Sequence, residues 1–420
     1  MQSWINLLFI VTMGSLKASD ILVKKFGGTS VGSIERIEHV ADRLVRDFKA
    51  GQRFVVVASA MAGETNRLVK MANDIYQDSR SAAYDMLLAS GEQVSIALLS
   101  MALQKRGIKA RPYLAFQLGI QTDSIYSKAK ITHIDTQKML SALENDEIPV
   151  IAGFQGIDVD ANITTLGRGG SDTTAVALAA ALGSRACEIY TDVDGVYTAD
   201  PRVVPDAKKI LTLNYEEMME MAALGSKVLH FRCVEIAAKY NVLIHVRSTF
   251  SEVEGTWIQS EVTAMEAPVV SAITHDAKIV VLGAEPAPNG VDFLTRLFKE
   301  LSNREVVVDI IAQAQGARGQ RIAFSISDED LAEGQLILKQ IVPPTSEILV
   351  LKDVAKVSIV GVGMRSHPGV AARFFDVLSQ KGIELHMVTT SDIKMSGVIP
   401  RQRLEEAVRG LHAEFKLDLP

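Results

Sequence analysis

The stretch TTLGRGGSDTTAVALAAALG, residues 164–183, places three glycines and an arginine directly before an alanine-rich run. Glycine lets a backbone approach a ligand closely and adopt positive φ, and Ser171 or Asp172 can cap a helix that we expect to begin at about Thr173. The N-terminus of a helix favours a phosphate or a carboxylate, and the planar guanidinium of Arg168 favours a carboxylate. The stretch therefore predicts an anion site at a strand-to-helix turn, although glycines and a cap could also simply build a tight turn.

Short apolar strands and amphipathic helices alternate on both sides of this turn, from residue 21 to about residue 247. The predicted strands are ILVKKF (21–26), RFVVVASA (53–60), IPVIAGF (148–154), ACEIYTD (186–192) and NVLIHVR (241–247). Apolar residues at helical spacing predict helices over 33–48 and 92–107. This alternation is typical of an α/β domain with a mostly parallel open sheet sandwiched by helices, in which ligands bind at the carboxyl ends of the strands.

The rest of the chain has a different organisation. Residues 248–266 lose the alternation and are predicted to be a linker. Beyond them, similar segments begin at Ala277 and at Ala355, and each has the pattern strand, turn, helix, two strands, helix and closing strand. We therefore expect two small α+β modules, over 267–345 and 346–420, which are either a duplicated structural unit or a pair of small-ligand sensors.

Composition narrows the possible classes of protein. A chain of 420 residues, 48% of them hydrophobic, is long enough for two or three soluble domains. Its net charge of -6 offers no basic surface for nucleic acid, and its two cysteines, outside any CxxC pair, argue against a disulfide scaffold or a thiolate metal site. Residues 1–20 hold an apolar run too short to span a membrane and without preceding Lys or Arg, so we expect a disordered extension or a true start at Met13, and a cytoplasmic protein.

Two other stretches end a predicted strand with ligand-binding residue types. VKKFGGTSVGS (23–33) has a lysine at the end of the strand, before the glycines, whereas the lysine of a Walker motif follows them. YTDVDGVYTADPRVVPDAKKI (190–210) combines hydroxyls, rings and an arginine in one loop. Taken alone, the first lysine could be a solvated strand end, and the second stretch could be a surface turn.

Taken together, these stretches resemble one family, the aspartate kinases of the amino-acid kinase superfamily. The motifs that carry the resemblance appear in the family's order: KFGGTSVG, SAMAGETN (59–66), SGEQVS (90–95), GFQG (153–156), TTLGRGGSDTTA, YTDVDGVYTADPR and GSKVLH (225–230). The resemblance covers nearly everything from Ile21 onward, implies an amino-acid kinase fold over 21–247, and identifies the repeated modules as similar to ferredoxin-like ACT domains.

The resemblance implies phosphorylation of the side-chain carboxylate of L-aspartate by ATP with Mg2+, the first step of lysine, threonine and methionine biosynthesis. By similarity, Lys25 and Asp172 are the catalytic residues, Lys25 stabilising the transferred phosphoryl group and Asp172 organising the lysine. The residues implied for aspartate are Ser59, Thr65, Glu92, Arg168, Gly169, Gly170 and Ser171. Those implied for ATP are Lys25, Gly27, Gly28, Ser30, Thr191, Asp192, Tyr197, Arg202 and Lys227, and no protein ligand for the metal is nominated.

The resemblance also implies inhibition by an end-product amino acid, lysine or threonine or both, and a homodimer or higher oligomer formed through the ACT domains. Candidate effector residues are Asp309 and Gln313 in the first module and Thr390 and Ser391 in the second. The first module departs from the usual Asp-x-Pro-Gly turn with PAPNG (286–290), which puts its effector contacts in doubt. No nucleic-acid or membrane partner is expected.

Two other functions stay open at this point. One is an acetylglutamate- or glutamate-type kinase of the same superfamily, although those enzymes lack the tandem C-terminal repeat. The other is a non-catalytic amino-acid sensor, against which the presence of Lys25, Arg168 and Asp172 argues.

Overall fold

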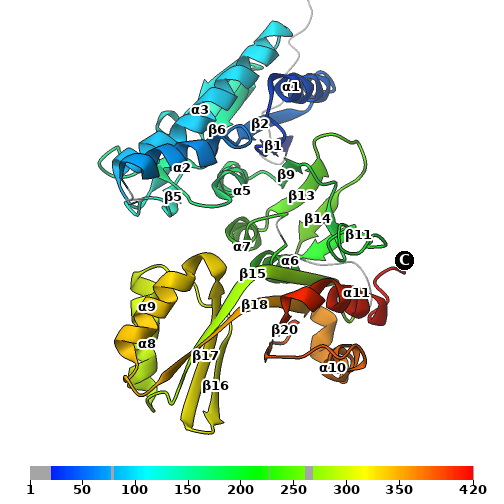
Figure 1. The fold of residues 1–420 in the computed structure, drawn as a ribbon. Helices are drawn as coiled ribbons and strands as arrows, with labels where there is room; N and C mark the ends of the chain where they lie inside the picture. Colours follow the sequence, from blue (N-terminus) through cyan, green and yellow to red (C-terminus); the bar gives the residue numbers. More distant parts are fainter. Residues whose placement is uncertain (1–19, 77–79, 227, 261–267, 420) are drawn as a thin grey trace, which may run out of the picture. The chain divides into compact units, whose positions relative to one another are not determined.

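The protein is described here from a computed structural model, which describes residues 20–76, 80–226, 228–260 and 268–419. The expectations for residues 1–19 therefore lie outside the described residues. The chain divides into two compact units (Figure 1). The first comprises residues up to 195 with 211–215 and 228–260, and the second comprises 196–210, 216–227 and 261 onward.

The first unit is built on an eight-stranded sheet with the order β12-β14-β13-β9-β1-β2-β6-β3. Its strands are β1 (Ile21–Phe26), β2 (Arg53–Ala58), β3 (Ala110–Tyr113), β6 (Ile148–Ala152), β9 (Ala186–Thr191), β12 (Thr212–Asn214), β13 (Leu243–Ser248) and β14 (Thr256–Gln259). The run from β13 to β3 is parallel throughout, and β14 joins it antiparallel to β13. The predicted mostly parallel sheet is confirmed.

Helices cover both faces of this sheet, as the pleat of β1 shows. Its helices are α1 (Ile34–Lys49), α2 (Glu64–Ile75), α3 (Ala82–Lys105), α4 (Gln137–Glu144), α5 (Gly170–Leu182) and α7 (Phe231–Tyr240). Because side chains alternate along a strand, Lys24 and Phe26 face α1, where Lys24 pairs with Asp47 at 2.5 Å. Lys25 faces the opposite side, towards α5.

A second, small sheet with the order β5-β4-β7-β8 leads into the glycine turn of the opening stretch. Its strands are β4 (Gln121–Thr122), β5 (Ile131–His133), β7 (Gln155–Ile157) and β8 (Ile163–Thr165), and a short 3-10 helix, η2 (Ala115–Leu118), precedes β4. Strand β8 ends directly before the turn, and α5 follows it.

The structure corrects three details of the sequence interpretation in this unit. Part of the predicted linker, Thr256–Gln259, is strand β14 of the main sheet. Helix α3 begins at Ala82, ten residues before the predicted start at 92. Helix α5 begins at Gly170 with Gly169 as its N-cap and without a side-chain cap, so the predicted capping by Ser171 or Asp172 is wrong.

Among the described residues, one helix, α3, is long and apolar enough to cross a membrane. More than half of its apolar window is buried inside the protein. Burial of that extent is typical of a core helix, and α3 contributes Ile96, Leu99 and Leu103 to the core.

The second unit contains a six-stranded antiparallel sheet with the order β16-β17-β15-β18-β20-β19. Its strands are β15 (Ala272–Glu285), β16 (Ile311–Gly316), β17 (Gly319–Ser327), β18 (Glu347–Val360), β19 (Met387–Thr390) and β20 (Lys394–Pro400). Its helices are α8 (Val291–Asn303), α9 (Leu331–Ile341), α10 (Val370–Gln380) and α11 (Leu404–Glu414), with 3-10 turns η3 (Asp328–Asp330), η4 (Val362–Ser366) and η5 (Arg401–Arg403). These elements form the two predicted α+β modules.

The two modules share their longest strands. The second half of β15, from Ile279, pairs with β17 in the first module, whereas Ala272–Asp276 pairs with the second half of β18, Lys356–Val360. No strand follows α11 in the residues described there, so the second module takes its closing strand from the start of β15. The expectation that each repeat carries its own closing strand is wrong for the second repeat.

Two segments from within the predicted catalytic region also belong to the second unit. The loop 196–210 forms the hairpin β10 (Val196–Tyr197) and β11 (Lys209–Ile210), and its Ala199, Val204 and Ala207 lie in the core of the second module. Most of α6 (Tyr215–Ala223) belongs there as well, since the buried carboxylate of Glu217 accepts hydrogen bonds from Ser271 Oγ at 2.6 Å and Val362 N–H at 3.1 Å. The predicted boundaries at 247, 266 and 345 stay a prediction.

Candidate active site

The first strand and the turn before α5 meet through a buried ion pair. Lys25 Nζ lies 2.5 Å from Asp172 Oδ1, and the two side chains are only 10% and 12% exposed. Lys25 is the next-to-last residue of β1, and Asp172 lies in the first turn of α5. A buried pair of this kind fixes the position of the ammonium group, because separating the charges in a protein interior is costly.

The glycines after β1 leave space beside that ammonium group. A Cβ atom on Gly27 would lie 3.5 Å from Lys25 Nζ, and one on Gly28 would lie 2.9 Å from the carbonyl oxygen of Ala60. A side chain on Gly27 would thus contact Lys25, and one on Gly28 would collide with the backbone at Ala60. Ser30, by contrast, is fully buried and its hydroxyl lies 2.6 Å from that of Thr249, so it is already used within the protein.

The turn around Arg168 depends on glycine at two positions. Gly167 and Gly169 have φ of 78° and 66°, and a Cβ atom on Gly169 would lie 2.2 Å from Cβ of His230. Gly170 donates its N–H to the carbonyl of Gly167 at 3.0 Å, which closes the turn. Arg168, between these two glycines, is exposed. Ser171 is buried in the first turn of α5, next to Gly153 at the end of β6.

Glu92 brings a buried carboxylate to the end of β2. Its Oε1 accepts the N–H of Ala60 at 3.1 Å, while its buried Oε2 has no hydrogen-bond partner among the described groups. Burial raises the pKa of Glu92 to about 8. Glu92 is therefore mainly protonated at neutral pH when no cation is bound beside it, and a cation bound at Oε2 would favour its carboxylate form. Ser59 follows β2 directly, and Thr65 lies in the first turn of α2.

The residues predicted for ATP do not all fall in one unit. Thr191 ends β9 and donates to Asp192 Oδ1 at 3.1 Å, in the first unit. Tyr197 and Arg202 belong to the second unit, where Arg202 pairs with Asp200 at 2.7 Å and holds the pKa of that carboxyl below its usual value. Lys227 lies outside the described residues.

The predicted effector residues lie at opposite edges of the second unit's sheet. Asp309 forms an ion pair with the buried Lys356, and Gln313 lies on the edge strand β16. Thr390 ends the other edge strand, β19, and donates to the carbonyl oxygen of Lys394 at 3.3 Å, with Ser391 following it. A single chain therefore does not bring the two sets together.

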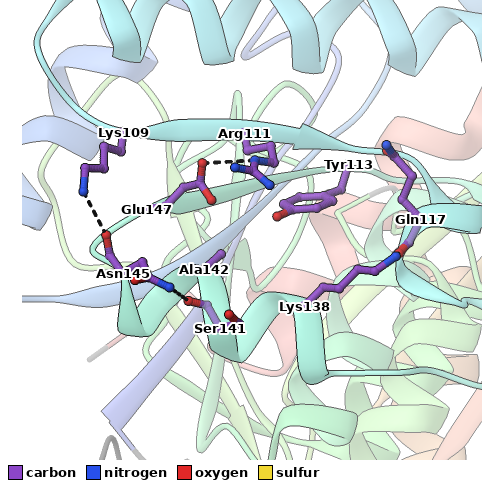
Figure 2. A pocket seen from close by; sticks show the side chains of 9 residues that line it. All are labelled: Lys109, Arg111, Tyr113, Gln117, Lys138, Ser141, Ala142, Asn145 and Glu147. Atoms are coloured by element: carbon purple, nitrogen blue, oxygen red, sulfur yellow. Dashed lines mark hydrogen bonds and ion pairs between the residues drawn. The ribbon is translucent and has the colours of Figure 1, made fainter.

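A cavity of about 570 Å3 lies elsewhere in the first unit, along the edge strand β3 (Figure 2). Its lining residues are Lys109, Arg111, Tyr113, Gln117, Lys138, Ser141, Ala142, Asn145 and Glu147. Its three cations bond to neighbours: Arg111 to Glu147 at 3.1 Å, Lys109 to the Asn145 carbonyl at 3.4 Å and Lys138 to the Gln117 carbonyl at 2.6 Å. Because β2 and β6 separate β3 from β1, the cavity is roughly 14 Å from Lys25, and we assign it no part in chemistry there.

The sequence interpretation missed two charged residues that hold the Arg168 turn. Asp85 and Arg232 both bond to the backbone that precedes the turn. A signal was present for Asp85, an acidic residue in a mostly apolar helix, since such a residue, when buried, needs several donors. For Arg232, two residues after the GSKVLH motif, the sequence offered no comparable signal.

Comparison with protein families gives two matches. Residues 20–248 match the amino acid kinase family, and residues 357–415 match an ACT domain. The first match covers strand β1 with Lys25, helix α3 with Glu92 and helix α5 with Asp172, and the second covers the C-terminal module of the repeat.

Comparison with individual proteins gives relatives along nearly the whole chain. An aspartokinase of Pseudomonas aeruginosa is 48% identical over 408 residues, which cover 95% of this chain and 98% of that protein. The solved structure of Escherichia coli aspartokinase III with aspartate and ADP (R-state) is 25% identical with a TM-score of 0.79, over 94% of this chain and 99% of that chain. The structure of the same enzyme with lysine and aspartate (T-state) is 24% identical with a TM-score of 0.75, over 94% and 100%, and shows the shared fold alone.

Proposed function

This chain belongs to the amino acid kinase family as an aspartate kinase, and from that premise we propose which of its residues transfer the γ-phosphoryl group of ATP to the side-chain carboxylate of L-aspartate. The observation that carries the proposal is the ion pair of Lys25 and Asp172 at 2.5 Å. It joins two motifs that are far apart in the sequence, at the end of the parallel strand where ligands of open α/β sheets bind.

The reaction needs positioning and charge stabilisation rather than a general base. The side-chain carboxyl group of free aspartate has a pKa of about 3.9, so it is ionised at neutral pH. One of its oxygens forms a bond to the γ-phosphorus as the bond from that phosphorus to the β-phosphate oxygen breaks, which gives L-4-aspartyl phosphate and ADP. The obstacle is the approach of two anions, which cations and N–H donors overcome.

Lys25 supplies the cation at the point of transfer. Its ammonium group stabilises the negative charge of the transferred phosphoryl group, and Asp172 keeps the ammonium group in place. Gly27 keeps side-chain atoms away from this ammonium group, since a Cβ there would lie 3.5 Å from Lys25 Nζ, while its own N–H bonds to the carbonyl of Tyr190 at 3.1 Å. A donor arrangement that exists before substrate binds costs no reorganisation during the reaction.

Arg168 and Glu92 bind the two ends of the amino-acid substrate. The guanidinium of Arg168, next to the N-terminus of α5, binds a carboxylate of aspartate with two parallel hydrogen bonds. The unpartnered Oε2 of Glu92 accepts the substrate ammonium, which also compensates the cost of its burial. Ser59, Thr65, Gly169, Gly170 and Ser171 complete this site in the proposal.

ATP is proposed to bind at the ends of β1 and β9, with Thr191 and Asp192 beside the glycines. The roles of Tyr197, Arg202 and Lys227 in ATP binding rest on the family resemblance alone. Mg2+ is proposed to accompany ATP and to neutralise charge on its phosphate oxygens. Among the described residues no three His, Cys, Asp or Glu side chains form a metal cluster. Asp192 is an exposed carboxylate that directly follows β9.

Regulation and assembly are part of the same proposal. The ACT match supports inhibition by an end-product amino acid, lysine or threonine or both. The edge strands β16 and β19 carry exposed Ile311 and Val388, and free edges of this kind favour pairing with a second copy. A homodimer through these edges would bring the two sets of effector residues together, and we place the enzyme in the cytoplasm, where ATP and aspartate are available.

The proposal is tested by trapping the acyl phosphate with hydroxylamine while ADP release is followed. ADP release that depends on L-aspartate and gives aspartyl hydroxamate is the expected result. Hydroxamate from N-acetylglutamate or glutamate alone would support the acetylglutamate-type kinase instead. Binding of an amino acid without ADP release would support a non-catalytic sensor.

A further inference from the structure

The carboxylate of Asp85 collects five hydrogen bonds from two segments that are distant in sequence. Its side chain is fully buried in the first turn of α3. It accepts the N–H of Ser127 at 2.9 Å and the N–H of Thr165 at 2.6 Å through Oδ2. Its Oδ1 accepts the same Ser127 N–H and the Ser127 hydroxyl, each at 3.1 Å, and the Thr165 hydroxyl at 2.9 Å.

Arg232 bonds to the same two segments through their carbonyl groups. It donates from one guanidinium nitrogen to the carbonyl of Leu166 at 2.9 Å and from the other to the carbonyl of Ala129 at 2.7 Å. Thus a carboxylate binds N–H groups of this region, while a guanidinium binds its carbonyl groups. Both side chains come from helices, α3 and α7, which are rigid supports.

Directly before the Arg168 turn, the backbone N–H and carbonyl groups of Thr165 and Leu166 are all hydrogen-bonded. The N–H of Thr165 bonds to Asp85, and its carbonyl accepts the N–H of Ala129 at 2.9 Å. The N–H of Leu166 bonds to the carbonyl of Phe154 at 2.9 Å, and its carbonyl accepts from Arg232. The next residue is Gly167, where a Cβ atom would lie 2.9 Å from the Ser127 carbonyl, so the turn is also closely packed against the Ser127 segment.

We propose that Asp85 and Arg232 are positioning residues that set the place of Arg168 and thereby the affinity for the carboxylate of the amino-acid substrate. This inference rests on the proposed role of Arg168. A bidentate bond between a guanidinium and a carboxylate tolerates little displacement, and supporting groups that lock the backbone provide that accuracy. Neither residue touches the reacting atoms in this proposal.

Variants at Asp85 test whether its hydrogen bonds, and not only the volume of its side chain, determine the affinity for aspartate. Asp85→Ala removes all five acceptor contacts, among them the one to the N–H of the fully buried Thr165. Asp85→Asn keeps one side-chain oxygen, which can accept the N–H groups of Ser127 and Thr165. The hydroxyls of Ser127 and Thr165 can rotate and accept hydrogen bonds from the new side-chain amide. We therefore expect Asp85→Ala to raise the KM for aspartate about tenfold or more, with the KM for ATP within about twofold of wild type, and Asp85→Asn to restore most of the affinity.

Two further variants complete the kinetic experiment. Asp123→Ala is the matched control, because Asp123 accepts N–H groups of Ile125 and Lys130 within the loop that holds Ser127 but, among the described residues, makes no hydrogen bond to the Arg168 turn, and we expect its kinetics to be near wild type. Arg168→Lys is the reference for a direct loss of the bidentate bond. If Asp85→Ala does not fold, Arg232→Leu with Arg232→Lys as its conservative partner makes the same test from the carbonyl side.

Hydrogen exchange of the amides of residues 166–170 gives a readout that does not need activity. Faster exchange there in Asp85→Ala than in Asp123→Ala, measured on the full chain without substrate, supports the inference. Wild-type exchange together with a wild-type KM for aspartate would overturn it, as would equal increases of the KM values of both substrates. Absence of aspartate-dependent ADP release in the wild type would instead refute the proposed function, while the exchange measurement still decides whether Asp85 fixes the turn.

Discussion

At the scale of single residues, the position of Lys25 depends on one buried partner. Its ammonium group is held 2.5 Å from Asp172 and lies next to Gly27, where a Cβ would be 3.5 Å from Nζ. The same side chain therefore has a structural role, as half of a buried ion pair, and a proposed catalytic one. The structural and the catalytic role can be distinguished by comparing a variant of Lys25 alone with a double variant of Lys25 and Asp172.

Lys25→Ala should lower turnover by roughly three orders of magnitude, because no other described cation replaces its charge at the point of transfer. It should also lower stability by about 3–5 kcal/mol, since Asp172 is left buried without a partner. The double variant Lys25→Ala with Asp172→Asn should regain most of the stability and none of the turnover. Steady-state ADP release and urea unfolding measure the two effects, and near-normal turnover of Lys25→Ala would contradict the assigned role.

Glu92 should make the stability of the substrate-free enzyme depend on pH. Burial raises its pKa from 4.5 to about 8, so the folded protein retains a proton that the unfolded chain releases. The contribution of Glu92 to stability is therefore fully present below about pH 4.5, falls as pH rises, and reaches its minimum above about pH 8. Urea unfolding between pH 5 and 9 should show a steeper loss for wild type than for Glu92→Gln, and parallel profiles would refute this.

At the scale of secondary-structure elements, helix α5 begins without a side-chain cap, and glycine geometry takes the place of one. Its N-cap Gly169 has a φ of 66° and packs directly under His230 of the segment before α7. Two elements of the candidate site are thus joined at a position that has no space for a side chain. This close approach explains why the turn needs glycine at that residue, beyond a general preference for flexible turns.

Gly169→Ala should destabilise the protein by about 2–4 kcal/mol, because the new Cβ adds a collision with His230 to the cost of a left-handed backbone. Gly51→Ala is the matched control. Gly51 also has positive φ, 89°, but has nothing within 4 Å of a new Cβ, so it should lose only about 1 kcal/mol. Urea unfolding compares the two variants, and equal losses would show that contact with His230 contributes nothing.

At the scale of the whole molecule, the second unit is one continuous sheet rather than two modules in series. Strands β15 and β18 run through both modules, and each module contributes one free edge, β16 or β19. A change in one module should therefore be transmitted to the other through shared strands. The hairpin 196–210 and most of helix α6 pack into this unit, so segments that follow strand β9 in sequence are part of it.

Lysine, threonine or their mixture should inhibit the enzyme, with a coupling free energy of about 1–3 kcal/mol between effector and substrate. Ser391→Ala and Asp309→Ala should raise the inhibitor concentration needed for half-inhibition while leaving uninhibited turnover unchanged. Asp353→Ala, at an exposed position of β18, serves as the control. Titration of ADP release with each amino acid measures this, and unaltered half-inhibition in both effector variants would remove these residues from the site.

The sequence by itself determined the strands of the parallel sheet and the motifs at their ends. Strands β1, β2, β6 and β9 begin at the predicted residues, because each is a short apolar run bounded by polar or glycine residues. The proximity of Lys25 and Asp172 was implied by the resemblance to aspartate kinases, since the strand before the Asp172 turn, β8, lies in the separate small sheet. These features depend on local patterns, which neighbouring residues in the chain carry.

Only the tertiary structure decided the features that depend on distant partners. Strand β14 forms because β13 and β12 offer unpaired edges, and the start of β15 becomes the closing strand of a module whose other strands come much later in the chain. Likewise, Asp85 gains its role from Ser127 and Thr165, and the pKa of Glu92 is raised by burial. Hydrogen-bond satisfaction and desolvation are set by what packs around a group in space, and a reading of neighbouring residues alone does not contain that information.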